Sequence, residues 1–160
     1  ENPSISINDL GQVLAVHDSG TGHLWYWTGQ VTSEGTIRWL RHGRYGTGVD
    51  PAVAINNAGH FVAVHKSENH DDLWGHTGQL LSTGEVLFSS NFEYDSGISP
   101  TIQFLSKDSS ELIERHLSEN TGLILNGYLC QECHYLGERR ENDPYPAIRR
   151  VCMAGFCEVV

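Results

Sequence analysis

The chain has 160 residues, which suits one domain with a sizeable core and is short for two. Its 39% apolar content, 17 glycines, four tryptophans and six tyrosines fit a turn-rich β protein better than a helical bundle or a disordered chain. A formal charge of −10 with scattered basic residues argues against nucleic acid as a partner, and the absence of any run of about 18 apolar residues argues against a membrane span.

The first segment of the chain returns in a second copy. Residues 3–17, PSISINDLGQVLAVH, match residues 51–65, PAVAINNAGHFVAVH, without a gap, and after one inserted residue the match resumes between 23–31 and 72–80. Self-similarity at a fixed period is the sequence signature of a repeat architecture. The sequence therefore predicts tandem repeats of about 49 residues, with complete copies at residues 3–50 and 51–99.

Each copy is expected to form four short antiparallel strands, because β-branched and aromatic runs alternate with turn residues. In the first copy, residues 4–7 lead through a turn that ends at Gly11 into a second strand at 13–17. A third strand carries Leu-Trp-Tyr, and the fourth follows Gly35. Gly11 and its counterpart Gly59 stand where a hairpin loop needs a positive φ angle.

A third, degenerate copy begins at Pro100 and fades after residue 123. His116 aligns with His65 but lies two residues farther from the proline that opens its copy, which predicts a longer first turn. The same alignment predicts a strand over 110–116. We therefore expect a repeat domain at residues 1–123, with 100–123 as the degenerate copy, and a divergent cysteine-containing tail at residues 124–160.

Two closed architectures use four strands per repeat, namely the blade of a β-propeller and the lobe of a β-trefoil. The length of the chain favours the trefoil, which closes with three lobes. The residue pattern favours propeller-like blades, because a Pro-x-x-x-Ile strand rich in small residues suits a crowded inner position. We therefore expect an all-β fold of blade-like units, with a β-trefoil as the alternative.

The repeated motifs have a counterpart in a known group of proteins. Their order, Pro-Ser-hydrophobic-x-hydrophobic, Val-x-x-Val-His-x-Ser, Leu-Trp-Tyr, Ile-x-Trp and Tyr-x-x-Gly, resembles the tandem blade-like repeats of predicted, mostly bacterial β-propellers, some attached to phospholipase-type domains. The resemblance covers residues 1–99 well and 100–123 weakly, and it implies no catalytic residues. Because a propeller usually needs four or more blades to close, it implies that the chain is a fragment or completes a ring as a homo-oligomer.

All four cysteines lie in the tail, at Cys130, Cys133, Cys152 and Cys157. They are compatible with two disulfides, with free thiols, or with a metal or redox site at Cys130-Gln-Glu-Cys133 and the adjacent His134. Four residues separate the second pair, which fits a tight zinc knuckle poorly, so we predict no metal and no cofactor. Disulfides would require an oxidising compartment and are consistent with a secreted or extracellular protein.

Histidine recurs at one position of the repeat, as His17, His65 and His116, each followed two residues later by a serine. In a ring, these histidines could converge on a metal or an anion. The interpretation we favour is structural, with the ring nitrogens tying neighbouring loops by hydrogen bonds. No nucleophile turn such as G-x-S-x-G accompanies these residues, so we predict that the protein is not an enzyme.

Tryptophans supply candidate ligand contacts, because aromatic faces stack on sugar rings. Trp74 aligns with Trp25, which favours packing between repeats as its role. Trp27 aligns with His76, and this variation makes Trp27 the better surface or ligand candidate.

Turns and loops supply the remaining candidates. Tyr45 and Tyr94 precede Gly-Thr-Gly and Asp-Ser-Gly turns where copies meet, so they are candidates for a ligand pocket as well as for anchoring the turn. The polar loop of the second copy holds Asn69 and Asp72, which can bind sugar hydroxyls or a cation, or can simply be solvated.

These residues support two hypotheses. The first is a non-catalytic, lectin-like carbohydrate-binding module with one shallow site per repeat, in which repetition adds avidity. The second is a structural or protein-interaction β-propeller portion of a larger protein, because the blade count is incomplete. The predicted ligand-binding residues, for glycans or a protein partner, are Trp27, Trp74, His17, His65, Tyr45, Tyr94, Asn69 and Asp72.

Overall fold

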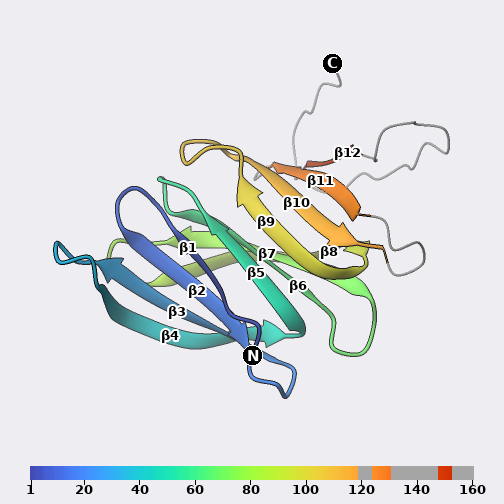
Figure 1. The fold of residues 1–160 in the computed structure, drawn as a ribbon, viewed down its shortest axis with the longest axis horizontal. Coiled ribbons are helices and arrows are strands. Elements are labelled where there is room, and N and C mark those ends of the chain that lie inside the picture. The colour runs from blue at the N-terminus through green and yellow to red at the C-terminus, as the bar shows by residue number, and fades with distance from the viewer. Residues whose placement is uncertain (119–123, 131–147, 153–160) are drawn as a thin grey trace.

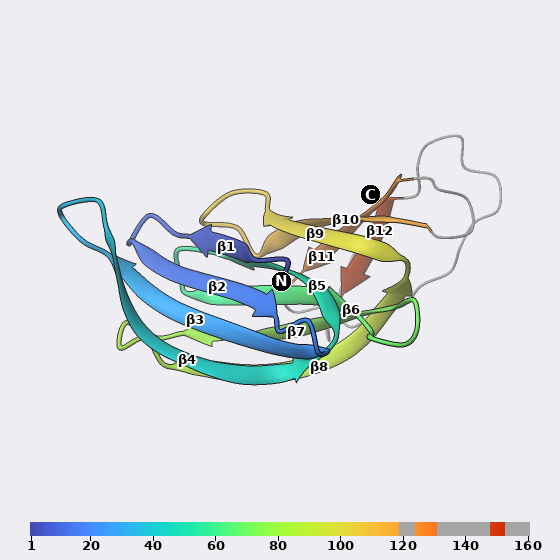
Figure 2. The same cartoon turned by 60° about the horizontal axis from the view of Figure 1, so that its bottom comes forward.

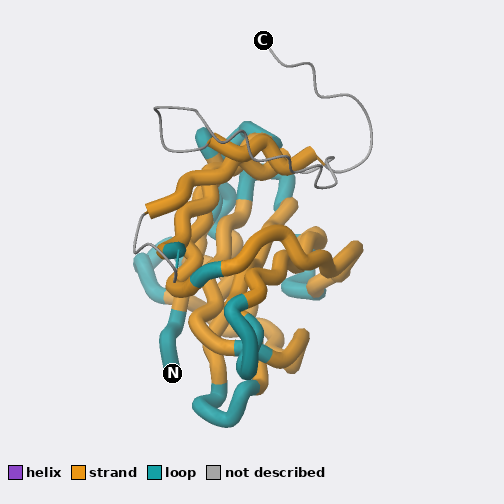
Figure 3. Tube along the Cα trace, turned by 90° about the vertical axis from the view of Figure 1, so that its right-hand side faces the viewer, coloured by secondary structure: helices purple, strands orange, loops and turns teal. Residues whose placement is uncertain are grey.

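The computed structural model describes residues 1–118, 124–130 and 148–152, with side chains for residues 1–118. Every regular element in these ranges is a β-strand (Figure 1, Figure 3). No helix long and apolar enough to cross a membrane is found in the described ranges. The strands are β1 (Ser4–Ile7), β2 (Gln12–Asp18), β3 (His23–Val31), β4 (Ile37–Thr47), β5 (Val49–Ile55), β6 (His60–Lys66), β7 (Asp72–Leu80), β8 (Val86–Ser96), β9 (Ile98–Phe104), β10 (Glu111–Leu117), β11 (Ile124–Cys130) and β12 (Ile148–Cys152).

The strands form three four-stranded sheets that follow one another along the chain. The first sheet is β1–β4, the second is β5–β8 and the third is β9–β12, and in each sheet neighbours in the chain are neighbours in the sheet. No sheet closes on itself within the described ranges. All pairs are antiparallel except β11 and β12, which run parallel. The parallel pair lies in residues 124–160, the predicted tail, so the prediction of antiparallel strands within the copies does not extend to it. The two strands are far enough apart in the sequence to form a parallel pair.

In the first and second sheets, the hairpin between the first two strands has the turn glycine that its sequence predicts. Gly11 and Gly59 adopt φ angles of 74° and 80°, values that cost glycine little. The turn between β5 and β6 spans residues 56–59, whereas that between β9 and β10 spans residues 105–110. The predictions of a positive φ at these glycines, of a longer third turn and of a strand close to 110–116 are confirmed.

The second sheet lies between the other two, and its strands β5 and β6 are buried on both faces (Figure 1, Figure 2). One face packs against the first sheet and holds Val53, Ile55, Phe61 and Ala63 against Leu14, Val16 and Tyr26. The other face packs against the third sheet and holds Ala52, Ala54, Val62 and Val64 against Phe104 and Leu112. Burial on both faces explains why β5 and β6 are almost continuously apolar.

The predicted boundary between residues 123 and 124 falls inside the third sheet. β11 begins at Ile124 and pairs along its length with β10, which ends before the boundary. The expectations for the four cysteines and for His134 concern side chains outside the described residues. The third sheet therefore continues past the residue at which the sequence similarity fades.

Candidate functional site

A cavity of about 320 Å³ opens where the first sheet meets the second, a contact that we call the first junction. Its walls come from the end of β4, from β6 and the residue after it, and from β7 and β8. Three residues predicted from the sequence line it, namely Tyr45, His65 and Trp74. The remaining lining residues are Gly46, Thr47, Ser67, His76 and Asn91.

The strand register brings the aromatic walls together. On β6 and β7, His65 stands opposite Trp74 and Ala63 stands opposite His76. The His65 and His76 rings stack with their centroids 5.1 Å apart. Tyr45 approaches the His76 ring edge-on, with a centroid distance of 5.3 Å. The cavity therefore has a rigid wall of aromatic rings that are carried by strands rather than by loops.

The cavity lacks formally charged side chains at neutral pH. Its lining includes no Asp, Glu, Lys or Arg. Burial lowers the pKa of His65 to about 3, with a further contribution from nearby His76, and burial also lowers the pKa of His76. Burial raises the pKa of Tyr45 far above its ordinary value. Both imidazoles and the phenol are therefore neutral, so the site suits a neutral polar ligand.

Two buried polar atoms at this site have no hydrogen-bond partner among the described residues. They are the hydroxyl oxygen Oη of Tyr45 and the Nδ1 nitrogen of His65. His65 itself is only 4% exposed. A buried polar group without a partner costs roughly 1–3 kcal/mol, and native proteins contain few of them. Their presence beside a cavity marks the place where a polar ligand would gain most.

At the second junction, between the second and third sheets, Tyr94 and His116 align with Tyr45 and His65. Their polar groups are satisfied within the protein. Tyr94 donates a hydrogen bond of 3.1 Å to Oε1 of Glu114. Nδ1 of His116 lies 3.1 Å and 3.0 Å from the two oxygens of the same carboxyl group. Nε2 of His116 lies 3.7 Å from Asp95. All three members of the Tyr94, Glu114 and His116 group are at most 4% exposed.

Two side chains account for the difference between the junctions. Glu114 aligns with Ala63, and Asp95 aligns with Gly46, which itself lines the first cavity. The first junction keeps the tyrosine and the histidine but lacks both carboxylates. His76 takes up part of the space, because a Cβ on Gly46 would come within 3.4 Å of its Nε2 atom. The first junction is therefore an open version of the second.

Trp27 and His17 lie elsewhere, on the face of the first sheet that points away from the second sheet. Trp27 donates a hydrogen bond of 3.4 Å from Nε1 to Nε2 of His17 and stacks on His42 with a centroid distance of 4.5 Å. Trp27 is 38% exposed and its neighbour Trp39 is 48% exposed. These side chains form an aromatic surface rather than a cavity.

The remaining predicted residues do not line the first cavity. Tyr94 is buried in the second junction. Asn69 is exposed in the loop between β6 and β7, and Asp72 begins β7. In the described part of the chain, no group of three or more His, Cys, Asp or Glu residues is placed to hold a metal. The three aligned histidines therefore do not meet at one metal site.

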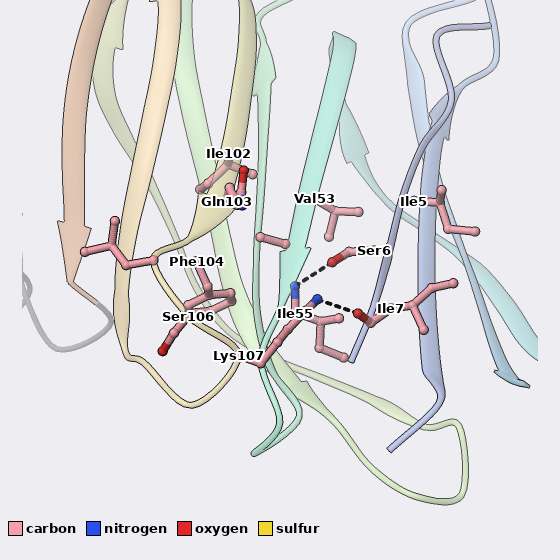
Figure 4. Close-up of a pocket in the computed structure, with 12 residues that line it drawn as sticks. Ile5, Ser6, Ile7, Val53, Ile55, Ile102, Gln103, Phe104, Ser106 and Lys107 are labelled. Carbon is pink, nitrogen blue, oxygen red and sulfur yellow. Dashed lines mark hydrogen bonds between the residues drawn. The ribbon is translucent and has the colours of Figure 1, made fainter. Parts of the chain in front are cut away.

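A second cavity, of about 370 Å³, lies among the first strands of the three sheets (Figure 4). It is lined by β1, β5, β9 and the turn after β9. Figure 4 shows Lys107 donating to the carbonyl of Ile7 and the backbone N–H of Ile55 donating to Oγ of Ser6. These polar groups are already paired within the protein, so this cavity is the weaker candidate for a ligand site.

The predicted set lacks three residues that shape the junctions, namely His76 and Asn91 at the cavity and Glu114 at the second junction. In the sequence, His76 stands out only as the counterpart of Trp27, and Asn91 carries no signal. Glu114 carries a usable signal in the sequence, because an acidic residue stands there at the position that aligns with Ala15 and Ala63. No protein-family model matches the chain, and no curated protein matches it either.

Proposed function

We propose that the protein is a non-catalytic binding module for a small neutral carbohydrate, which it holds in the cavity of the first junction. The observation that carries this proposal is an uncharged cavity with aromatic walls, lined by Tyr45 and His65, whose Oη and Nδ1 atoms are buried without partners among the described residues. Sugars combine apolar ring faces with hydroxyl groups, and this cavity offers partners for both.

The dimensions and the rim support a ligand of one or two sugar units. Ligand sites typically measure roughly 300–1,000 Å³, and the cavity of about 320 Å³ lies at the small end of that range. Trp74 is half-buried in the wall and Asn91 is exposed at the rim. The Trp74 ring can stack on a sugar face, while the Asn91 amide can both donate and accept hydrogen bonds.

The same geometry supports binding without catalysis. Ser67 and His65 both line the cavity, but His65 Nδ1 has no hydrogen-bond partner, so it does not activate the Ser67 hydroxyl. No carboxylate lines the cavity, so it lacks the pair of acidic groups that most glycosidases use. A secreted or extracellular location would suit a glycan ligand.

The wider architecture extends the proposal. We interpret the three sheets as blade-like units of tandem repeats of about 49 residues, in an open arrangement related to a β-propeller. The sequential strand order within each sheet supports this interpretation, as does the stacking of the sheets face to face. In such an arrangement, ligand sites belong at the junctions between units, where the cavity lies.

A second candidate function, a protein-interaction or structural unit, is favoured by the outer face of the first sheet. Ile5 is 53% exposed there, and Trp27 and Trp39 are also exposed. Large exposed apolar side chains that gather on one face often mark an interface. Light scattering tests this candidate: a homo-oligomer that dissociates in Trp39→Glu would support an interface completing a ring, and a monomer at all concentrations would count against it.

Binding of methyl α-pyranosides of glucose, galactose and mannose, followed by calorimetry or by NMR shifts, tests the carbohydrate proposal. We expect at least one sugar to bind, and Trp74→Ala to weaken its binding at least tenfold. Asn91→Ala is the milder variant, because this exposed side chain can be removed without disturbing the core. Trp39→Ala, on the outer face, is the matched control and should bind as the wild type does. A folded protein that binds none of these sugars would contradict the proposal.

A further inference from the structure

The hydrogen bonding of His65 determines which of its nitrogens carries the proton. The ring makes a hydrogen bond to the backbone of Thr47, and this bond raises the pKa of His65 against the larger opposing effect of burial. A bond that favours the protonated ring is one that the ring donates. Because Nδ1 has no partner, the donor is Nε2. In the neutral imidazole, Nδ1 is then a bare acceptor.

Tyr45 presents the complementary group. Burial keeps its phenol neutral, so Oη carries a proton that has no acceptor among the described residues. The first junction therefore holds one unpaired acceptor nitrogen, Nδ1 of His65, and one unpaired O–H donor, at Tyr45. A ligand atom that serves both must accept one hydrogen bond and donate another.

The second junction shows that one oxygen can reach both groups. Oε1 of Glu114 lies 3.1 Å from the hydroxyl of Tyr94 and 3.1 Å from Nδ1 of His116. The backbone around the two histidines is alike. A Cβ on Gly48 would collide with Cδ2 of His65, and a Cβ on Gly97 would collide with Cδ2 of His116. The two rings are therefore held against aligned glycines, which supports transferring the bridging geometry to the first junction.

We propose that the ligand is recognised through a single hydroxyl group that accepts a hydrogen bond from Tyr45 Oη and donates one to His65 Nδ1, in the place that Glu114 Oε1 occupies at the second junction. This inference rests on the proposed function and names the chemical group of the ligand that the site recognises. A carboxylate ion has no proton to give Nδ1. An ammonium group cannot accept the Tyr45 proton. A hydroxyl on a neutral sugar satisfies both atoms at once.

The first test needs no ligand. Nitrogen-15 NMR of the histidine rings at pH 7 reports which nitrogen of His65 is protonated, with His65→Gln identifying the signal. We expect His65 to be neutral and protonated on Nε2. Protonation on Nδ1 would overturn the inference. Carbohydrate binding itself is tested separately, by the binding experiments with methyl pyranosides described above.

The second test removes ligand hydroxyls one at a time. For the methyl pyranoside that binds best, we expect one monodeoxy analogue to bind at least tenfold more weakly than the others, because a site built around a hydroxyl is left with unpaired groups when that hydroxyl is absent. Tyr45→Phe should shrink that difference. Tyr94→Phe makes the same change at the second junction, is the matched control and should preserve it.

The outcomes separate the two proposals. If the sugar binds but all monodeoxy analogues bind equally well, the hydroxyl bridge is wrong and the carbohydrate proposal stands. If no sugar binds to the folded protein, the carbohydrate proposal fails and the bridge fails with it. If Tyr94→Phe alters discrimination as much as Tyr45→Phe does, the site has been placed at the wrong junction.

Discussion

The two junctions of this protein contain the same pair of residue types, a tyrosine and a histidine, but they differ in whether the polar groups of that pair have partners. Each places a tyrosine from the fourth strand of one sheet beside a histidine from the second strand of the next. At the second junction, Glu114 joins Tyr94 to His116. At the first, Ala63 leaves Tyr45 Oη and His65 Nδ1 unpaired beside a cavity. Two aligned positions thus decide whether a junction is filled by the protein or open to a ligand.

This difference illustrates how binding and stability compete between two junctions of one fold. A filled junction gains hydrogen bonds and packing, and it has no need of another molecule. An open junction leaves buried polar groups unpaired and recovers that cost only when a ligand binds. Substitutions that fill or empty a junction, or that change its charge, therefore test whether this difference affects stability.

Acidification should act on the first junction with the largest effect. The pKa of His65 falls to about 3 in the folded protein, from about 6.5 in an unfolded chain. As pH drops below 6.5, the unfolded state gains a proton that the folded state does not. Stability is therefore full above that pH and is lost toward pH 3, at about 1.4 kcal/mol per unit or about 5 kcal/mol in all. Urea unfolding between pH 7.5 and 4 measures the slope.

Substitution of His65 shows how much of this dependence of stability on pH comes from that residue. His65→Gln removes the titrating group, so its stability should fall less steeply with acid than that of the wild type. Neighbouring His76 has a pKa lowered by burial and contributes with the same sign, while Tyr45 stays neutral throughout. His70→Gln lies in an exposed loop and is the control. Identical slopes for wild type and His65→Gln would show that His65 is not held neutral by burial.

Emptying the second junction should cost the next largest amount. Glu114→Ala leaves Tyr94 and His116 without the carboxyl group that joins them, and it also opens a cavity. We expect a loss of about 3 kcal/mol in urea unfolding at pH 7. Glu111→Ala, on the same strand but exposed, is the control and should change stability by less than about 0.5 kcal/mol. A loss below about 1 kcal/mol for Glu114→Ala would mean that the network contributes little.

Substitution of the glycine that lies against His65 at the first junction should have a smaller effect on stability. Gly48 has a φ angle of 148°, and a Cβ there would overlap the His65 ring. We expect Gly48→Ala to cost about 2 kcal/mol, from strain and from displacement of the ring. At Gly35, with a φ angle of 77° and no atom within 4 Å of the added Cβ, the same change should cost about 1 kcal/mol. Equal losses would show that His65 moves freely away.

Removal of a hydroxyl from each tyrosine should have the smallest effects, differing between the junctions. Tyr94→Phe removes the donor to the buried Glu114 carboxyl, so we expect a loss of about 1 kcal/mol. Tyr45→Phe removes a hydroxyl that has no partner among the described residues, so stability should stay within about 0.5 kcal/mol of wild type or rise. Thermal unfolding of both variants in ligand-free buffer makes this comparison. A larger loss for Tyr45→Phe would contradict the assignment of an open junction.

Local features of the fold follow from the sequence alone. Alternating apolar and polar residues and turn glycines such as Gly11 and Gly59 predict strands and hairpins, because these depend on neighbours only a few residues away. The all-β class and the longer third turn could be predicted for the same reason. The parallel pairing of β11 with β12 could not, since it joins segments separated by residues 131–147.

The candidate site depended on contacts between sheets. The sequence by itself determined that Tyr45, His65 and Trp74 were worth attention, through their places in the repeat and their chemistry. It did not separate Tyr45 from Tyr94, which align with each other in the sequence. Only the tertiary structure decided that Glu114 satisfies one tyrosine while the other faces a cavity, because the space at a junction depends on side chains from two packed sheets at once.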